Sequence, residues 1–309
     1  MRSKYLIFTI CALFIGHFSN AQRRSSYYKL DVGGYLGMSN YLGEIGGKEK
    51  TERPFIWDMK LNQTRWAMGG TVRYKFNNYF AVHGSLNYQR IQCDDALSTN
   101  RGRRGRNLNF RNDILDLSVR GELYIYGIPD VGGTGRYRLD FQSYAFVGVA
   151  GYLHGPKTIY EGAWTKLRPL MTEGQAKPYS KVGISIPTGL GFYFTKKRKY
   201  RFGAEVCWKL TFTDYIDDIS TVYADPTVLT SQAAIDLNNR HDEVSGNPDV
   251  PDDRYYAPGE KRGDSSDNDT YFYVGFSYSY VFRGRNSFYS QNYNWIGGRG
   301  KRDRVKVKF

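Results

Sequence analysis

His83 and Ser85 are the residues of this sequence whose types and spacing come nearest to catalytic chemistry. A serine activated by a histidine base is a common nucleophile in covalent catalysis. Two positions apart in an extended strand, these side chains share a face, but the spacing does not force them into contact and no third catalytic group can be assigned. His154 and His241 have no partner at a recognisable metal-ligand spacing. We therefore predict no catalytic residue and no cofactor.

Acidic residues gather in the segment TFTDYIDDISTVYAD, 211–225. Asp214, Asp217, Asp218 and Asp225 offer oxygen ligands of the kind that Ca²⁺ prefers, but their spacing is not that of an EF-hand loop. Nothing in the sequence fixes a coordination shell around them. We expect carboxylates that are solvated or bonded to the backbone, and we predict no metal site.

The elements that must hold these residues are predicted to be strands. In WAMGGTVRYKF, 66–76, apolar residues occupy every second position, and small or charged residues fill the positions between them. The alternation resumes at residue 80, after Asn77 and Asn78, which accept the positive φ of a tight hairpin turn. We expect eight such strands, at 27–38, 66–76, 79–91, 112–126, 140–154, 182–194, 200–213 and 270–282.

The predicted connections alternate in length. The short ones are 77–78, 127–139 and 195–199, and the long ones are 39–65, 92–111, 155–181 and 214–269. Outer-membrane barrels place short turns in the periplasm and long loops outside. The sequence thus predicts an all-β fold, an eight-stranded antiparallel transmembrane outer-membrane β-barrel with long extracellular loops. Within the longest loop, 226–269 is rich in Asp, Asn, Pro and Gly, and we expect it to be mobile.

The same alternation predicts which side chains face lipid. In 140–154 two parities are open, and we favour lipid contact by Phe141, Ala145, Val147, Val149 and Leu153 over contact by Tyr144, Phe146 and Tyr152. An inward charged set predicts a lumen filled by paired side chains rather than an open pore; it comprises Arg73, Lys75, Arg120, Glu122, Glu205 and Lys209. Aromatic residues near the short turns predict a periplasmic girdle: Tyr74, Phe76, Tyr79, Phe80, Tyr124, Tyr126, Phe192, Phe194, Tyr200, Phe202, Tyr280 and Phe282.

Residues 1–21 have the pattern of a secretory signal peptide. Arg2 and Lys4 precede the apolar run 5–15, and small residues end at Ala21. We therefore divide the chain into a signal peptide at 1–21, a barrel at 22–282 and a basic, aromatic periplasmic tail at 283–309. The 27 Tyr and 34 Gly suit a small barrel with aromatic girdles. Cys93 and Cys207 fall at different heights of their strands, so we expect no disulfide.

Two basic clusters stand out in a chain of formal net charge +14. RGRRGR, 101–106, falls in a predicted outer loop, where lipopolysaccharide phosphates or solvent are the expected surroundings, and not nucleic acid. The tail 283–309 interleaves aromatic and basic residues, which favours docking on an acidic partner over a disordered tail resting on anionic phosphates. The residues predicted to bind that partner are Arg283, Arg285, Tyr289, Tyr293, Trp295, Arg299, Lys301 and Arg302.

Two segments, SNYLGEIGG at 39–47 and TFTDYIDDISTVYAD at 211–225, resemble in their order the PorG family of outer-membrane barrels. That family belongs to the type IX secretion and gliding machinery of the Bacteroidetes. The resemblance implies a non-enzymatic protein in the outer membrane of a Gram-negative (Bacteroidetes) cell, with periplasmic termini. Its implied partners are a periplasmic ring of PorK-type lipoprotein and PorN-type subunits, besides outer-membrane lipid and lipopolysaccharide. The signature residues are Asn40, Tyr41, Gly43, Glu44, Gly46, Gly47, Asp214, Tyr215, Asp217 and Asp218.

Taken as residues alone, the glycines of 39–47 allow a tight, left-handed chain path, while Asn40 and Glu44 cap or bond the loop backbone. The tail is not part of the family pattern, so its docking is predicted from its residues only. Two other functions stay open: a stand-alone OmpA- or OmpX-like barrel for membrane integrity or adhesion, and a barrel enzyme that modifies lipid A.

Overall fold

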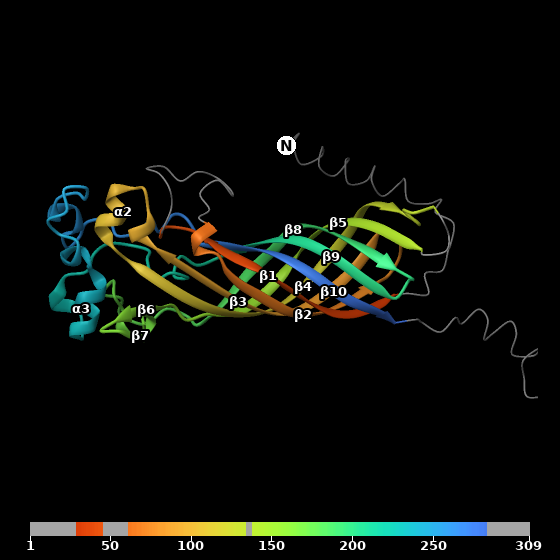
Figure 1. Cartoon of the computed structure of the whole chain (residues 1–309). Coiled ribbons are helices and arrows are strands. Elements are labelled where there is room, and N and C mark those ends of the chain that lie inside the picture. Colours follow the sequence, from red (N-terminus) through yellow and green to blue (C-terminus); the bar gives the residue numbers. More distant parts are fainter. Residues whose placement is uncertain (1–28, 46–60, 134–137, 283–309) are drawn as a thin grey trace, which may run out of the picture. The chain divides into compact units, whose positions relative to one another are not determined.

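The computed structural model describes residues 29–45, 61–133 and 138–282 (Figure 1), all within the compact unit Tyr28–Gly284. The predicted signal peptide and the predicted tail lie outside the described residues. Among the described residues, no helix is long and apolar enough to cross a membrane.

Eight long strands form one closed antiparallel barrel. They are β1 (Leu30–Leu42), β2 (Arg65–Lys75), β3 (Phe80–Asp94), β4 (Asn109–Ile128), β5 (Leu139–Leu153), β8 (Val182–Lys196), β9 (Tyr200–Thr211) and β10 (Thr270–Phe282). Their order around the barrel is β3-β2-β1-β10-β9-β8-β5-β4, and pairing of β3 with β4 closes the sheet. The first and last strands pair from Leu30 opposite Phe282 to Leu42 opposite Thr270. The predicted eight-stranded barrel is confirmed.

The long connections carry short elements that we call the crown, defined as the described residues 43–45, 95–108, 154–181 and 212–269. Its elements are η3 (Asp95–Leu97), α2 (Arg101–Arg106), the hairpin β6 (Lys157–Tyr160) and β7 (Ala163–Lys166), η4 (Arg168–Leu170), η5 (Pro226–Val228), α3 (Gln232–Asn238), η6 (His241–Glu243) and η7 (Asp253–Tyr256). A further short helix, η2 (Leu61–Gln63), precedes β2. The β6–β7 hairpin was not predicted; it joins the barrel where Lys157 pairs with Arg111 of β4.

The segment 226–269 is a folded part of the crown, contrary to the prediction of a mobile loop. Ala234 and Leu237 of α3 are buried, and His241 stacks on Tyr256 at 4.2 Å between ring centroids. The His241 ring nitrogens lie 2.8 Å from Gly105 O and 2.8 Å from an Asp253 carboxylate oxygen. The segment 226–269 therefore packs against the rest of the crown and forms hydrogen bonds with it through its polar side chains.

The β2–β3 turn uses its asparagine differently from the prediction. Asn77 Oδ1 accepts hydrogen bonds from the backbone N–H groups of Tyr79 at 2.8 Å and Phe80 at 2.7 Å, and Asn77 is not among the described residues of positive φ. A left-handed turn lies instead between β8 and β9, where Lys197 and Arg198 have φ values of 52° and 59°. Side-chain bonding can thus replace positive φ in a short turn.

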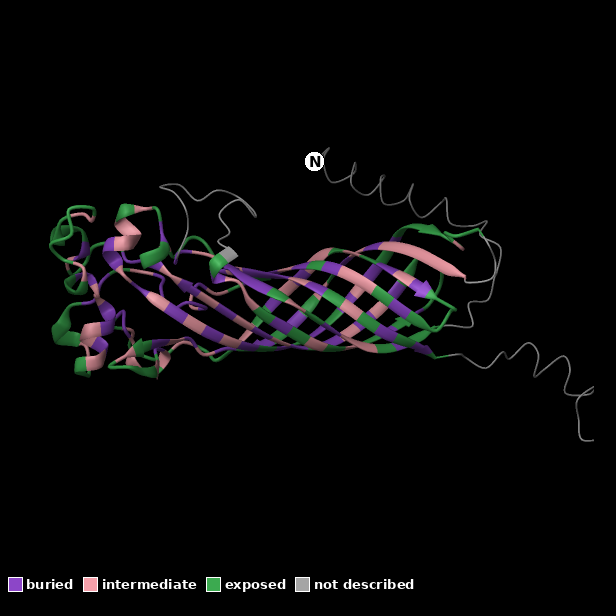
Figure 2. Ribbon diagram, viewed as in Figure 1, coloured by how far each residue is buried: buried purple, intermediate pink, exposed green. Residues whose placement is uncertain are grey.

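Burial alternates along the middle of each barrel strand (Figure 2). On β5, Val147, Val149 and Leu153 are exposed while Tyr144 and Tyr152 are buried, so the favoured aliphatic parity is confirmed. On β4, outward residues from Leu115 to Ile125 are apolar or glycine. That span matches the roughly 9–11 residues that a tilted strand needs to cross a bilayer. An apolar exterior around a polar interior is the arrangement of an outer-membrane barrel.

One residue of the predicted girdle points the other way. Tyr124 is buried inside the barrel, whereas Tyr126 is exposed. The register with β5 shifts between these two residues, so that Ile125 is an extra residue and the parity of β4 inverts there. Of the other predicted girdle residues, Phe194 is half-buried and the rest are exposed on the outer wall.

Glycines inside the barrel make room for aromatic rings of the neighbouring strand. Tyr144 of β5 lies opposite Gly191 of β8, and Tyr152 lies opposite Gly183. A Cβ atom added to Gly191 would lie 2.5 Å from the Tyr144 ring, closer than any real contact. The abundance of Gly and Tyr in the sequence therefore reflects packing within a narrow lumen.

Candidate functional site

His83 and Ser85 face the lumen but do not form a catalytic pair. Both are buried, and His83 Nδ1 has no hydrogen-bond partner. The Ser85 hydroxyl lies 2.6 Å from that of Ser118 and accepts a hydrogen bond from Asn87 Nδ2 at 3.0 Å. Ser85 is therefore part of a polar network across strands and is not activated by His83.

The lumen is filled by the charged side chains that the sequence placed there. Arg120 donates to both carboxylate oxygens of Glu205, at 3.1 and 2.5 Å, and Arg73 likewise holds Glu122 at 2.6 and 3.1 Å. Lys209 Nζ lies 2.9 Å from Asp116 Oδ1. These three cations each have a counter-charge, which is the condition under which buried ions are tolerated. Lys75, the remaining cation of the predicted inward set, is also buried, and its Nζ donates to Gln142 Oε1 at 2.8 Å instead of to a carboxylate.

The first signature segment meets the second at Tyr41. The Tyr41 hydroxyl lies 2.7 Å from Asp217 Oδ2 and also contacts Asp269 Oδ1, which precedes β10. Asp217 Oδ1 accepts the backbone N–H of Ile219, and Asp269 Oδ2 accepts that of Ile216, at 3.0 and 2.9 Å. Asp217 is bonded to the backbone, as expected for the acidic segment, and the two carboxylates together tie the end of β1 to two distant parts of the crown.

Gly43 and Glu44 shape the first segment in two ways. A Cβ atom on Gly43 would lie 2.0 Å from the Tyr41 hydroxyl, so glycine is required by close approach and not by a left-handed backbone. Glu44 accepts a hydrogen bond from the backbone N–H of Asp264, as expected of a loop-bonding residue. Asn40 Nδ2 donates to Thr64 Oγ1 at 3.0 Å. Gly46 and Gly47 lie outside the described residues.

Asp218 belongs to a second buried network, which the sequence did not reveal. Its carboxylate accepts hydrogen bonds from Thr172 Oγ1 at 2.6 Å and Tyr179 at 2.7 Å, while its carbonyl accepts one from Arg262 at 2.7 Å. The same Arg262 Nη1 lies 2.9 Å from Glu173 Oε1. Arg262 and Glu173 come from different loops with no characteristic spacing, so only the fold brings them together.

Asp214 is the exception among the four acidic residues. It is 7% exposed, and neither of its carboxylate oxygens has a hydrogen-bond partner. Burial raises its pKa to about 8, and the charges of Asp217 and other nearby carboxylates add to the shift. Tyr215 beside it stacks on Tyr179 at 4.8 Å between ring centroids. Asp214 is thus neither solvated nor bonded to the backbone, and the prediction is wrong for this residue.

The RGRRGR cluster forms α2, and its last arginine is buried. Arg106 binds both carboxylate oxygens of Asp95, at 2.7 and 3.2 Å, and donates to Arg262 O at 2.7 Å and Glu44 O at 3.0 Å. Arg101 donates to two loop carbonyls, Pro248 O and Asp249 O, each at 3.0 Å. These two arginines therefore hold crown loops together, a role that the sequence motif did not predict.

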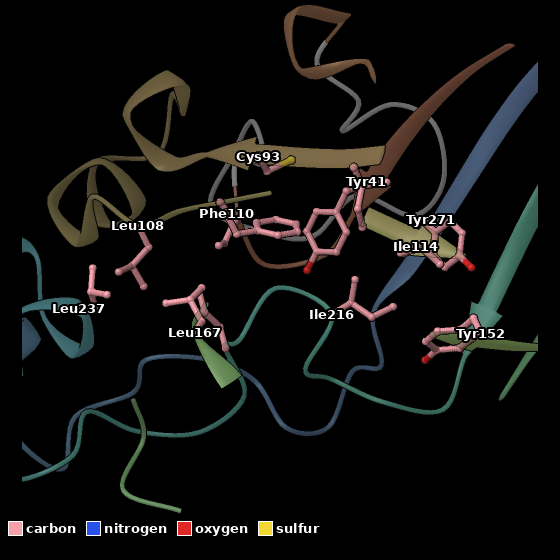
Figure 3. Packing of buried hydrophobic residues seen from close by; sticks show 13 residues of the cluster. Tyr41, Cys93, Leu108, Phe110, Ile114, Tyr152, Leu167, Ile216, Leu237 and Tyr271 are labelled. Carbon is pink, nitrogen blue, oxygen red and sulfur yellow. The ribbon is translucent and has the colours of Figure 1, made fainter. Parts of the chain in front are cut away.

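An apolar core underlies these polar networks (Figure 3). Tyr41 and Phe110 pack edge to face at 4.9 Å between ring centroids, and Ile216 from the second signature segment joins them. The cluster reaches from Leu237 of α3 to Tyr271, which faces the lumen. The crown thus closes the loop end of the barrel with a continuous core.

Two further expectations concern cysteine and metal. Cys93 and Cys207 are both buried, and the structure has no disulfide between them. Within the part of the chain that the structure describes, no three His, Cys, Asp or Glu residues are placed to hold a metal ion together. The predicted partner-binding residues of the tail, Arg283 to Arg302, lie outside the described residues.

A family model matches residues 4–231, which cover most of the barrel and the second signature segment. This chain belongs to the family described as Domain of unknown function (DUF6089). No curated protein matches the sequence. The DUF6089 description carries no activity, substrate or partner.

Solved structures similar to this DUF6089 chain are outer-membrane proteins with low overall similarity. Ail of Yersinia pestis is 11% identical with a TM-score of 0.35, covering 82% of this chain and 99% of that chain. The N-terminal barrel domain of Pseudomonas aeruginosa OprF is 9% identical with a TM-score of 0.33, covering 82% and 98%. OprG of Pseudomonas aeruginosa is 11% identical with a TM-score of 0.36, covering 82% and 93%. The barrel fold of this chain rests on its own strand register and apolar exterior.

Proposed function

We propose that this DUF6089 protein is a non-enzymatic structural component of the type IX secretion and gliding machinery. It resides in the outer membrane of a Bacteroidetes cell. Its termini and short turns face the periplasm, where it associates with a ring of PorK-type lipoprotein and PorN-type subunits. The strand register and the apolar exterior described above give an outer-membrane barrel fold, which is compatible with a structural role.

The observation that supports a role in the secretion machinery is that the two signature segments contact each other. Tyr41 of the first bonds to Asp217 of the second, and Ile216 packs in the same core. Two segments that resemble one family in sequence thus form one structural unit. A unit held by so many buried contacts is suited to present a fixed surface within an assembly.

The topology supports the proposed orientation. The beginning of β1 and the end of β10 pair with each other at the end of the barrel that also carries the short turns. In single-chain bacterial barrels that end faces the periplasm. Tail residues such as Tyr293 and Trp295 would then reach ring subunits, and their cations would steer the tail to acidic surfaces.

The lumen geometry argues against a lipid-modifying enzyme, because Ser85 is bonded to Ser118 and not to His83. A stand-alone barrel for membrane integrity or adhesion has the same fold and is separated from the proposal only by its partners. We expect His83→Ala to leave the composition of lipid A unchanged.

The test is purification of the tagged protein from native outer membranes in mild detergent, followed by mass spectrometry. The full-length chain is compared with a chain that ends at Phe282. Recovery of PorK- and PorN-type proteins with the full chain alone supports both the secretion role and tail docking. Recovery with both chains supports the role and moves the contact to the barrel. A stable barrel that is recovered alone, while the ring stays intact, overturns the proposal in favour of a stand-alone barrel.

A further inference from the structure

Charged residues on the outer wall of the barrel are concentrated at one place. At the crown end of the described barrel strands, outward charges lie on β3 and β4, joined by Arg65 at the start of β2, whose Nε donates to Gln92 of β3. The corresponding ends of β1, β5, β8, β9 and β10 carry no outward charge among the described residues. On β3 and β4 the charged residues are Arg90, Asp94, Arg111 and Asp113.

The centre of this surface is a single carboxylate surrounded by cations. Asp113 Oδ1 lies 2.7 Å from Arg90 Nε, and Oδ2 lies 3.6 Å from Arg111 Nη2 and 3.5 Å from Lys157 Nζ. Lys166 lies directly opposite Lys157 in the β6–β7 hairpin and is exposed. We call Arg90, Arg111, Lys157 and Lys166 the wall cations. One carboxylate cannot neutralise four cations, so the surface keeps a positive excess.

Asp94, the other outward carboxylate on β3 and β4, does not remove this excess. Asp94 lies at the crown end of β3, and its Oδ1 accepts the backbone N–H of Ala96 at 2.9 Å. It therefore caps η3. Arg65 adds another cation on the β2 side. The surface as a whole holds more cations than carboxylates even with Asp94 included.

Aromatic side chains frame the wall cations. Trp66 stacks on Tyr88 at 4.8 Å between ring centroids, and the Arg90 guanidinium lies 5.4 Å from the Trp66 ring. On the other side, the Arg111 guanidinium lies 4.4 Å from the Trp164 ring of β7. Trp and Tyr gather at membrane interfaces because one part of each ring system is apolar and the other polar.

The position of the wall cations along the barrel favours a lipid ligand over a soluble anion. Toward the short turns, the next outward residues are Leu86 after Tyr88 on β3, and Leu115 and then Leu117 after Asp113 on β4. All three leucines are exposed on the apolar band. The wall cations thus lie at the boundary between that band and the crown, at the depth of lipid headgroups and beside acyl chains. A soluble anion would need no apolar band beneath its site, whereas a phosphorylated lipid uses both.

We propose that the wall cations bind the phosphorylated sugar headgroup of an outer-leaflet glycolipid of the lipid A class. Arg90, Arg111 and Lys157 contact phosphate oxygens while Asp113 holds them in place, and the acyl chains lie along Leu115 and Leu117. The placement of this site in the outer leaflet rests on the orientation given under the proposed function. Binding of the headgroup by the purified protein does not depend on that orientation.

The experiment measures binding of the full-length protein in detergent micelles to three probes: lipid A, lipid A stripped of its phosphates, and inorganic phosphate. We compare wild type with Arg90→Gln/Arg111→Gln. The matched control is Arg198→Gln/Lys199→Gln, which removes two charges from the short turn between β8 and β9. Heat-modifiable mobility on gels verifies that each barrel is folded. Lys157→Gln/Lys166→Gln changes the two wall cations on the β6–β7 hairpin and leaves the eight barrel strands unaltered, so it provides a second test if the strand variant does not fold.

The expected result is lipid A binding that weakens about 30-fold in either wall-cation variant and stays unchanged in the control, as the loss of two cations at a lipid surface implies. Stripped lipid A and inorganic phosphate should bind wild type far more weakly. Equal binding of lipid A by wild type and both wall-cation variants overturns the proposal. Equal binding of inorganic phosphate and lipid A assigns the site to soluble anions and overturns it too. A variant that no longer binds lipid A but still co-purifies with the ring subunits would show that lipid A binding and the secretion role are independent.

Discussion

The Tyr41 hydroxyl lies 2.7 Å from Asp217 Oδ2 across 176 positions of the chain, and it also contacts Asp269. One hydroxyl carries one proton and cannot donate to two carboxylates. Burial raises the pKa of both Asp217 and Asp269 well above the usual range. One carboxyl therefore keeps a proton and donates it to Tyr41, which donates to the other. This shared arrangement joins the barrel wall to both ends of the longest described crown loop.

Tyr41→Phe should loosen the crown and leave the barrel folded. The change removes the hydroxyl but keeps the ring, so it leaves two buried carboxyl groups short of a partner at a cost of about 1–3 kcal/mol. Limited proteolysis of outer membranes should cut the crown faster, with heat-modifiable gel mobility unchanged. Tyr35→Phe is the matched control, because the buried Tyr35 hydroxyl has no hydrogen-bond partner. Equal proteolysis of the two variants would contradict this account.

Asp214→Asn should flatten the pH dependence of crown stability. Because the pKa of Asp214 is raised to about 8 in the folded crown, an opened crown binds fewer protons between about pH 4 and pH 8. The stability of the wild-type crown therefore falls as pH rises through that window, and part of this slope is lost in the variant. Hydrogen-exchange protection factors of crown amides measure it. Asp267→Asn, at an exposed position, should keep the wild-type slope, and a shared slope in all three proteins would refute the assignment.

Glu205→Gln should destabilise the barrel strongly. Arg120 would lose a bidentate partner in the lumen, and removal of one partner of a buried ion pair costs about 3–5 kcal/mol. The urea midpoint of unfolding in micelles should fall accordingly. Glu243→Gln removes the partner of Arg240 at a half-exposed site and should cost less than about 1 kcal/mol. Similar midpoints for the two variants would mean that the lumen is hydrated enough to screen its charges.

Gly191→Ala should destabilise the barrel, whereas Gly70→Ala should not. A methyl group at Gly191 meets the Tyr144 ring at 2.5 Å, and such overpacking costs about 1–3 kcal/mol. Gly70 on the outer wall has nothing within 4 Å of the same position. The two variants make the same chemical change, one in closed space and one in open space. Equal urea midpoints for the two variants would contradict the packing described for β5 and β8.

The barrel was predictable because a strand that separates lipid from a polar lumen must alternate with a period of two, as at Val147 and Val149. What the alternation could not show is where it breaks. The extra residue at Ile125 lets Tyr126 face outward although Tyr124, two positions earlier, faces the lumen, and no residue type marks that shift. The acidic segment 211–225 was found from its composition, but its partners were not. Arg262 and Glu173 meet only after the loops fold, and their separation in the chain carries no signal.

The most direct test of the proposed secretion role is to measure secretion of proteins with type IX signals in cells that lack this gene. Secreted cargo should be lost from the medium of these cells, and wild type and His83→Ala should each restore it. Outer membranes of the deletion strain should otherwise keep their integrity. Normal secretion in the deletion strain, with the ring intact, would contradict a role in the secretion machinery.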